Sequence, residues 1–177
     1  MRRHAFTLVE LLIVVAIIAI LSALALVNFA NAQSRAKVAR VKADIRTIAA
    51  ALECYHTDEG IYPAAAIGDA PLAEPLEALT APRAYLTSIL HDPFGTAPFD
   101  FAPEIRMLGY NYKDAASTSV GMQAETYGKV WAELPNRKYM LHSCGPNRRW
   151  DVTPYVEYDT TNGTTSNGDI CYFGPMG

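Results

Sequence analysis

Glu10 is the residue whose placement in this chain most clearly demands a chemical partner. It lies in an apolar stretch from Phe6 to Val27, after a short head that carries Arg2 and Arg3. A carboxylate at the centre of a bilayer costs about 2.5–3.5 kcal/mol on insertion scales, and such a residue usually marks a function. We therefore expect another group to pair with Glu10.

Catalytic chemistry is not indicated by the other polar residues. His4, His56, His91 and His142 show no metal-ligand spacing, and no glycine-rich phosphate loop occurs. The sequence therefore predicts a protein that is not an enzyme.

The element that carries Glu10 is predicted to be a membrane helix. Leu11–Val27 contains no charge and one hydroxyl, that of Ser22. About 20 such residues, at a rise of 1.5 Å each, span the hydrocarbon core of a bilayer. No other segment of the chain is as long and apolar, so we expect the remainder to lie outside the membrane.

Three interpretations of this N-terminus compete. Cleavage after Ala32, at the small residues Ala30-Asn31-Ala32, would make it an ordinary signal peptide and release a soluble binding domain. A plain membrane anchor would explain the length but gives Glu10 no role. Cleavage between Ala5 and Phe6 would leave the helix on the mature protein, with a new amine close to Glu10.

The helical pattern continues beyond the membrane stretch. Apolar residues recur every three or four positions and form one stripe: Val38, Val41, Ile45, Ile48, Leu52 and Tyr55. Basic residues occupy much of the polar remainder, namely Arg35, Lys37, Arg40, Lys42 and Arg46. Gly60, with Pro63 shortly after it, predicts the end of the helix.

A helix of this length predicts a polymer. From residue 6 to about residue 57 it would be about 75 Å long, which a small domain cannot bury. Its N-terminal half must therefore lie in lipid or among copies of itself.

The rest of the chain is predicted to be one compact domain with an antiparallel sheet. Aromatic and β-branched residues indicate strands over 107–113, 127–134 and 137–144, with a turn at residues 134–137. The tail from Pro146 to Asp169 is polar and is predicted to be a loop.

The N-terminal residues resemble a known processing motif. Ala5-Phe6-Thr7-Leu8-Val9-Glu10-Leu11-Leu12 is similar to that of type IV prepilins and type II secretion pseudopilins, with Ala5 where glycine is usual. The resemblance implies cleavage between Ala5 and Phe6 by a prepilin peptidase. It also implies that Phe6 becomes the N-methylated first residue and that Glu10 meets the N-terminus of a neighbouring subunit.

Three further segments resemble the G-type major pseudopilin of type II secretion. They are residues 53–63 (ECYHTDEGIYP), 91–95 (HDPFG) and 143–147 (SCGPN). Members of that family hold calcium in the C-terminal loop, and the matching positions here are Ser143, Asn147 and Asp169. Asn147 stands where Asp is usual, so the set loses one charge on which calcium affinity depends.

Charge and cysteines set the remaining bounds. Removing Met1–Ala5 deletes two arginines and moves the formal net charge from -3 to -5, which argues against broad affinity for acidic surfaces and nucleic acid. Cys54, Cys144 and Cys171 allow three pairings, with at most one intrachain disulfide. We expect the Cys144–Cys171 bridge, because both residues belong to the sheet and tail whereas Cys54 lies on the helix.

These observations predict a pilin-like α+β subunit, in which a long N-terminal helix packs on a small antiparallel sheet. Residues 1–5 are the leader, 6–57 the helix with a membrane half (6–28) and an amphipathic half (29–57), and 58–177 the globular domain. The resemblance implies a pseudopilus subunit in the bacterial inner membrane, with a periplasmic domain, that polymerises with itself and meets an assembly platform and minor pseudopilins. A type IV pilus subunit and the released binding domain are the alternatives.

Overall fold

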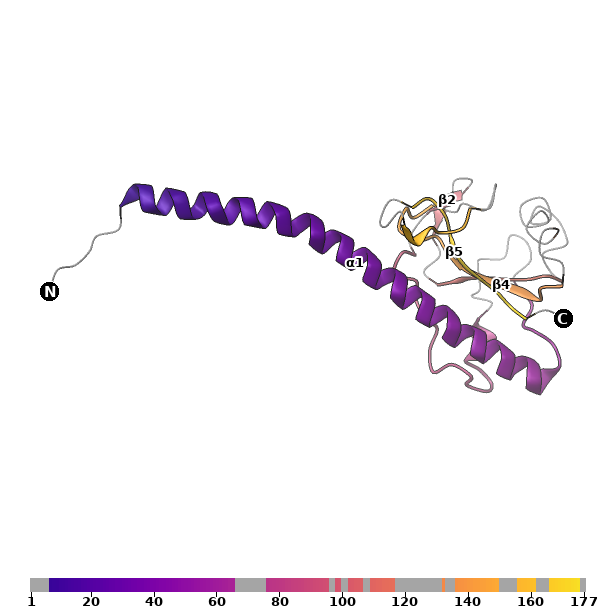
Figure 1. Cartoon of the computed structure of the whole chain (residues 1–177). Coiled ribbons are helices and arrows are strands. Elements are labelled where there is room, and N and C mark those ends of the chain that lie inside the picture. The colour runs from indigo at the N-terminus through magenta and orange to yellow at the C-terminus, as the bar shows by residue number, and fades with distance from the viewer. Residues whose placement is uncertain are drawn as a thin grey trace.

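A single long helix dominates the computed structural model (Figure 1), which describes residues 7–65, 76–95, 98–99, 102–106, 109–116, 132, 136–149, 156–161 and 166–175. Helix α1 runs from Leu8 to Glu59 without interruption. It ends two residues beyond the predicted position 57, at Gly60, whose φ of 76° is left-handed and whose N–H donates to the His56 carbonyl at 2.9 Å. The expected closure at Gly60 is therefore confirmed.

The helix is continuous because its sequence holds no strong breaker. Ala19 and Val27 lie within it, and neither carries the penalty of glycine or proline in a helix interior. Figure 1 shows a gentle curve in place of a kink.

Two antiparallel sheets follow α1. β1 (Pro98–Phe99) and β2 (Ala102–Arg106) form a hairpin, while β3 (Asn111–Asp114), β4 (Tyr139–Ser143) and β5 (Ile170–Phe173) form a three-stranded sheet with β4 at its centre. A short 3-10 helix, η1 (Glu77–Leu79), precedes them. The pilin-like α+β architecture is confirmed.

The predicted strands are confirmed in part. β4 lies within the expected segment 137–144, and β3 overlaps the expected segment 107–113 but extends one residue beyond it, whereas the expected strand 127–134 falls outside the described residues except for residue 132. The β1–β2 hairpin and β5 are additions, and β5 directly follows the predicted loop.

The core joins the second half of α1 to one face of the three-stranded sheet. The apolar stripe of the helix is buried as expected from Val38 to Leu52, with Tyr55 partly buried at its edge. Opposite it lie Tyr110, Tyr112, Tyr139, Leu141 and Ile170, all at most 4% exposed. The globular domain therefore covers only the C-terminal half of α1.

Candidate functional site

The N-terminal site begins with a capping box at the start of α1. Thr7 is the N-cap, and its hydroxyl and its backbone N–H donate to Oε2 of Glu10 at 2.7 and 2.8 Å. In return the Glu10 N–H donates to the Thr7 hydroxyl oxygen at 3.3 Å. The carboxylate of Glu10 is thus hydrogen-bonded within its own subunit, and it satisfies donors that a helix start otherwise leaves open.

The predicted processing residues lie next to this cap. Ala5 and Phe6 fall outside the described residues, so cleavage between them stays a prediction. Thr7, the first described residue, is extended, with φ of −83° and ψ of 149°. Glu10 therefore lies four positions along the chain from Phe6, where cleavage would create a new amine.

The first half of α1 presents an uncovered apolar surface. Every large apolar side chain that the structure describes from Leu8 to Phe29 is exposed, by 45–80%. This is the one helix of the described residues that is long and apolar enough to cross a membrane. A soluble protein would leave such a surface in contact with water, which the hydrophobic effect opposes.

Tyrosine hydroxyls attach the globular domain to carboxylates of α1. Tyr110 donates to Asp44 at 2.8 Å, and Tyr139 and Tyr62 donate to the two oxygens of Glu53 at 2.9 and 3.0 Å. Burial, together with the Glu53 carboxylate, raises the pKa of Tyr62 to about 12 and that of Tyr139 well above its usual range. These hydroxyls therefore stay protonated and hold the domain on the helix.

Asp58 makes a further attachment at the end of α1. It accepts from Tyr85 and from Arg83, both at 2.9 Å, and the Tyr85 ring meets that of Tyr55 edge to face. These residues fasten the segment after η1 to the helix.

The three predicted calcium residues lie at one end of the sheet but have protein partners. Oδ2 of Asp169 is 3.2 Å from Nδ1 of His142, and both side chains are fully buried. The Ser143 hydroxyl accepts from Gly145 N–H at 3.3 Å, and Oδ1 of Asn147 accepts from Arg149 N–H at 3.1 Å. Among the described residues no group of three or more His, Cys, Asp or Glu side chains is placed to hold a metal.

Backbone oxygens and one further carboxylate surround these residues. A Cβ on Gly145 would lie 2.7 Å from the Gly168 carbonyl oxygen, so the two loops are in direct contact. Burial raises the pKa of Asp92, while hydrogen bonds from Ser143 and from Phe94 N–H oppose that shift. The donors here are mostly oxygen, which is the ligand type that calcium prefers.

The expected Cys144–Cys171 disulfide is not formed in the structure. β4 and β5 pair His142 with Cys171, which makes Cys144 a diagonal neighbour of Cys171 on the same face. Diagonal neighbours have Cα atoms about 7–8 Å apart, beyond the usual 4.4–6.8 Å of a disulfide. Burial also raises the pKa of the Cys144 thiol to about 12, so little reactive thiolate forms. Non-reducing peptide mapping tests the pairing.

Two sequence profiles match the chain on either side of residue 27. The prokaryotic N-terminal methylation motif covers residues 1–26, and type II secretion system protein G covers residues 28–106. The chain is 32% identical over 127 residues to type II secretion system core protein G of Pseudomonas aeruginosa, covering 66% of this chain and 89% of that protein. The chain belongs to the family of type II secretion system core protein G.

Other comparisons agree with this family. The core protein G of Klebsiella pneumoniae is 29% identical over 100 residues, which cover 54% of this chain and 71% of that protein. The type IV major pilin protein PilA of Myxococcus xanthus is 40% identical over 61 residues, 34% of this chain and 28% of the pilin. No solved structure matches. The chain is thus a pseudopilin with an N-terminal methylation motif.

Sequence reasoning missed two features of these sites. The spacing of Thr7 and Glu10 is the T-x-x-E pattern of a capping box, which was available as a signal. The contact between His142 and Asp169 had no such signal, because it depends on the register of two strands that are far apart in the chain.

Proposed function

We propose that this pseudopilin is cleaved between Ala5 and Phe6, held in the bacterial inner membrane by residues 6–28, and polymerised through α1 into a periplasmic filament. Growth of that filament would help to drive folded proteins through an outer-membrane channel. The proposal is supported most directly by Glu10, a hydrogen-bonded carboxylate at the start of a helix whose first half is uncovered. Its partners would be further copies of itself, a prepilin peptidase, an inner-membrane assembly platform and minor pseudopilins.

The Thr7 cap gives Glu10 two successive partners in this scheme. In the isolated subunit the hydroxyl and N–H of Thr7 satisfy the carboxylate, which lowers the penalty of placing it in an apolar layer. In the filament the Phe6 amine of a neighbour would pair with it, and both charges would be neutralised away from water. Assembly would then depend on the cationic Phe6 amine of a neighbour, which replaces Thr7 as the partner of Glu10.

The mature N-terminus tests the processing step. Intact-mass analysis of the membrane protein is expected to give a chain that starts at methylated Phe6. A chain that starts at Gln33 would instead support the released binding domain and overturn the pseudopilus.

Substitution of Glu10 tests the assembly step. Glu10→Ala is expected to accumulate in the membrane at wild-type levels and to form no filaments, whereas Ser22→Ala, at another polar position of the apolar run, is expected to assemble normally. Wild-type filament yield from Glu10→Ala would remove its role.

A type IV pilus subunit is the second candidate. The match to PilA favours it, but that match covers only 61 residues. Loss of export without loss of surface pili, after deletion of the gene, would favour the pseudopilus.

We also propose a calcium ion at Ser143, Asn147 and Asp169, assisted by the loop carbonyls and by Asp92. The bound ion would join the turn after β4 to the start of β5 and stabilise the native state by mass action. Chelation is expected to lower the melting temperature of the wild-type protein but not that of Asp169→Asn. An unchanged wild-type melting curve would argue against the ion.

A further inference from the structure

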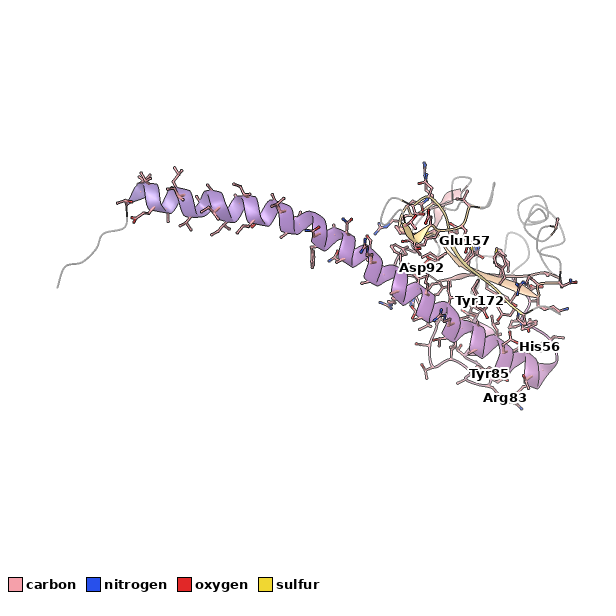
Figure 2. All side chains as sticks on the ribbon, in the orientation of Figure 1. His56, Arg83, Tyr85, Asp92, Glu157 and Tyr172 are labelled. Carbon is pink, nitrogen blue, oxygen red and sulfur yellow. The ribbon has the colours of Figure 1, made fainter. Side chains whose placement is uncertain are left out.

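A groove lies beside α1, on the side where β5 and the segment 156–161 approach the helix. Its volume is about 250 Å³. Its walls include Lys42, Ile45 and Arg46 from α1, and Glu157, Tyr158 and Tyr172 from the facing segments. Figure 2 shows Glu157 and Tyr172 on this side of the helix.

The groove has an excess of positive charge. Nζ of Lys42 lies 5.9 Å from the centroid of the Tyr158 ring, so its charge is held at the groove. Arg46 is exposed, and within the described part of the chain it makes no ion pair or hydrogen bond. Glu157 supplies one opposing charge, which leaves the groove with a net charge of about +1 and suits it to a carboxylate.

A lipid headgroup does not reach this groove. Arg46 follows Val27 by 19 residues, which places it about 28 Å along the helix from the end of the apolar stretch. The headgroup region extends only about 5–8 Å beyond the hydrocarbon core on each side. A lipid is therefore ruled out as the source of the carboxylate.

The segment that contains η1 is attached to the opposite side of α1 from the groove. At about 100° per residue, Lys42 and Arg46 lie on one side of the buried stripe, while Tyr55 and Asp58 lie on the other. Figure 2 shows Tyr85 and Arg83 across the helix from Tyr172, and the Tyr85 N–H donates to the Leu79 carbonyl of η1 at 2.8 Å.

Glu77 begins η1 on that opposite side. Its side chain is exposed and has no hydrogen bond or ion pair to the residues that the structure describes. Asp58, in contrast, is occupied by Arg83 and Tyr85.

A parallel polymer brings two different surfaces of the subunit together. Head-to-tail assembly uses two different surfaces of each subunit, and the apolar halves of all copies must point the same way. Tyr85, whose N–H bonds to η1, is fastened at Tyr55 and Asp58, which follow Arg46 by 9 and 12 residues, or about 14–18 Å along the axis. A neighbour displaced by that distance toward the membrane has its Glu77 level with Arg46.

We propose that the groove receives the Glu77 carboxylate of a second copy of this chain, which lies about 15 Å closer to the membrane. The contact rests on the filament proposed above and sets how neighbouring subunits are placed along it. It differs from the pairing of Glu10, which lies at the other end of the helix.

A charge exchange tests the contact in the full-length protein. Arg46→Glu and Glu77→Arg are each expected to lower filament yield on the order of tenfold, since reversal replaces an exposed attraction by a similar repulsion. The double variant that carries both changes is expected to regain most of the wild-type yield. Failure of the double variant to recover would overturn the proposal.

Matched variants make the result specific to this pair. Arg35→Glu reverses another exposed base of α1 outside the groove, and Glu59→Arg reverses another exposed acid. Glu77→Arg is expected not to rescue Arg35→Glu, and Glu59→Arg is expected not to rescue Arg46→Glu. Rescue by Glu59→Arg in place of Glu77→Arg would also contradict the proposed partner.

Cross-linking gives a second readout and separates this proposal from the filament itself. With Cys54 and Cys171 replaced by serine, Arg46→Cys combined with Glu77→Cys is expected to give a ladder of oligomers on a non-reducing gel. Filaments that depend on Glu10 but give no ladder would refute the groove contact alone. Absence of filaments from the wild-type protein would instead refute the proposed function.

Discussion

Glu53→Ala removes the carboxylate that holds two tyrosines of the globular domain on α1. Tyr139 and Tyr62 donate to its two oxygens at 2.9 and 3.0 Å. Tyr139 is fully buried whereas Tyr62 is only partly buried, so water replaces the lost partner less easily at Tyr139. The two hydrogen bonds therefore differ in what their loss costs.

The expected loss of stability follows from these environments. A hydrogen bond to a charged group contributes about 1.5–3 kcal/mol, and a buried donor left unsatisfied incurs a penalty of the same order. With water replacing Glu53 at Tyr62, we expect Glu53→Ala to lower the free energy of unfolding by about 3 kcal/mol. Tyr139→Phe, which removes the buried donor along with its bond, is expected to cost about 1.5 kcal/mol.

Chemical denaturation of the full-length protein in detergent measures these differences. In a double-mutant cycle, Glu53→Ala and Tyr139→Phe share one bond, so their combined effect is expected to fall short of the sum by at least about 1 kcal/mol. Glu59→Ala is the matched control, because Glu59 is exposed on the same helix. Equal effects of Glu53→Ala and Glu59→Ala, or strict additivity in the cycle, would refute the reasoning.

Three other predictions concern pH, a glycine and the filament. The pKa of Tyr62 is raised from its ordinary value near 10 to about 12. The stability that its protonated hydroxyl contributes is therefore complete below pH 10 and is lost as the pH rises through 12. Absorbance at 295 nm reports the ionisation, and circular dichroism reports the unfolding. Ionisation of Tyr62 near pH 10 in a native protein would contradict this. Gly168→Ala is expected to lower the free energy of unfolding by about 1–3 kcal/mol, because φ is 139° and the new Cβ would lie 2.7 Å from the Glu157 carbonyl oxygen. Gly60→Ala is expected to cost less. Equal losses for the two variants in a denaturant titration would show that the close contact with Glu157 is not the cause. In a filament map, α1 is expected to remain helical from Ala19 to Val27, and extended backbone there would show that subunit packing controls this segment.

The helix was predictable because its signals are local. An uncharged run, an apolar stripe and a closing glycine each depend on residues within a few turns of one another, and the spacing from Val38 to Leu52 identified the buried face. β4 was also predictable, since Tyr139 and its neighbours have strong β-preference.

The rest of the sheet and most site contacts depend on distant residues. β5 contains only four residues beside a polar tail, and its partner becomes known only from the register with β4. The pairs of Glu53 with Tyr139 and of His142 with Asp169 join residues 86 and 27 positions apart. Periodicity has no information over such separations, so these contacts required the structure.

The attachments between domain and helix also determine how the subunit carries mechanical load. The bonds at Asp44, Glu53 and Asp58 are spread over 14 residues, or about 21 Å of α1. A force directed along the helix axis loads all three in shear together, whereas a force that peels the domain sideways opens them one after another. Axial pushing is thus the direction in which the globular domain stays on its helix under the greatest force.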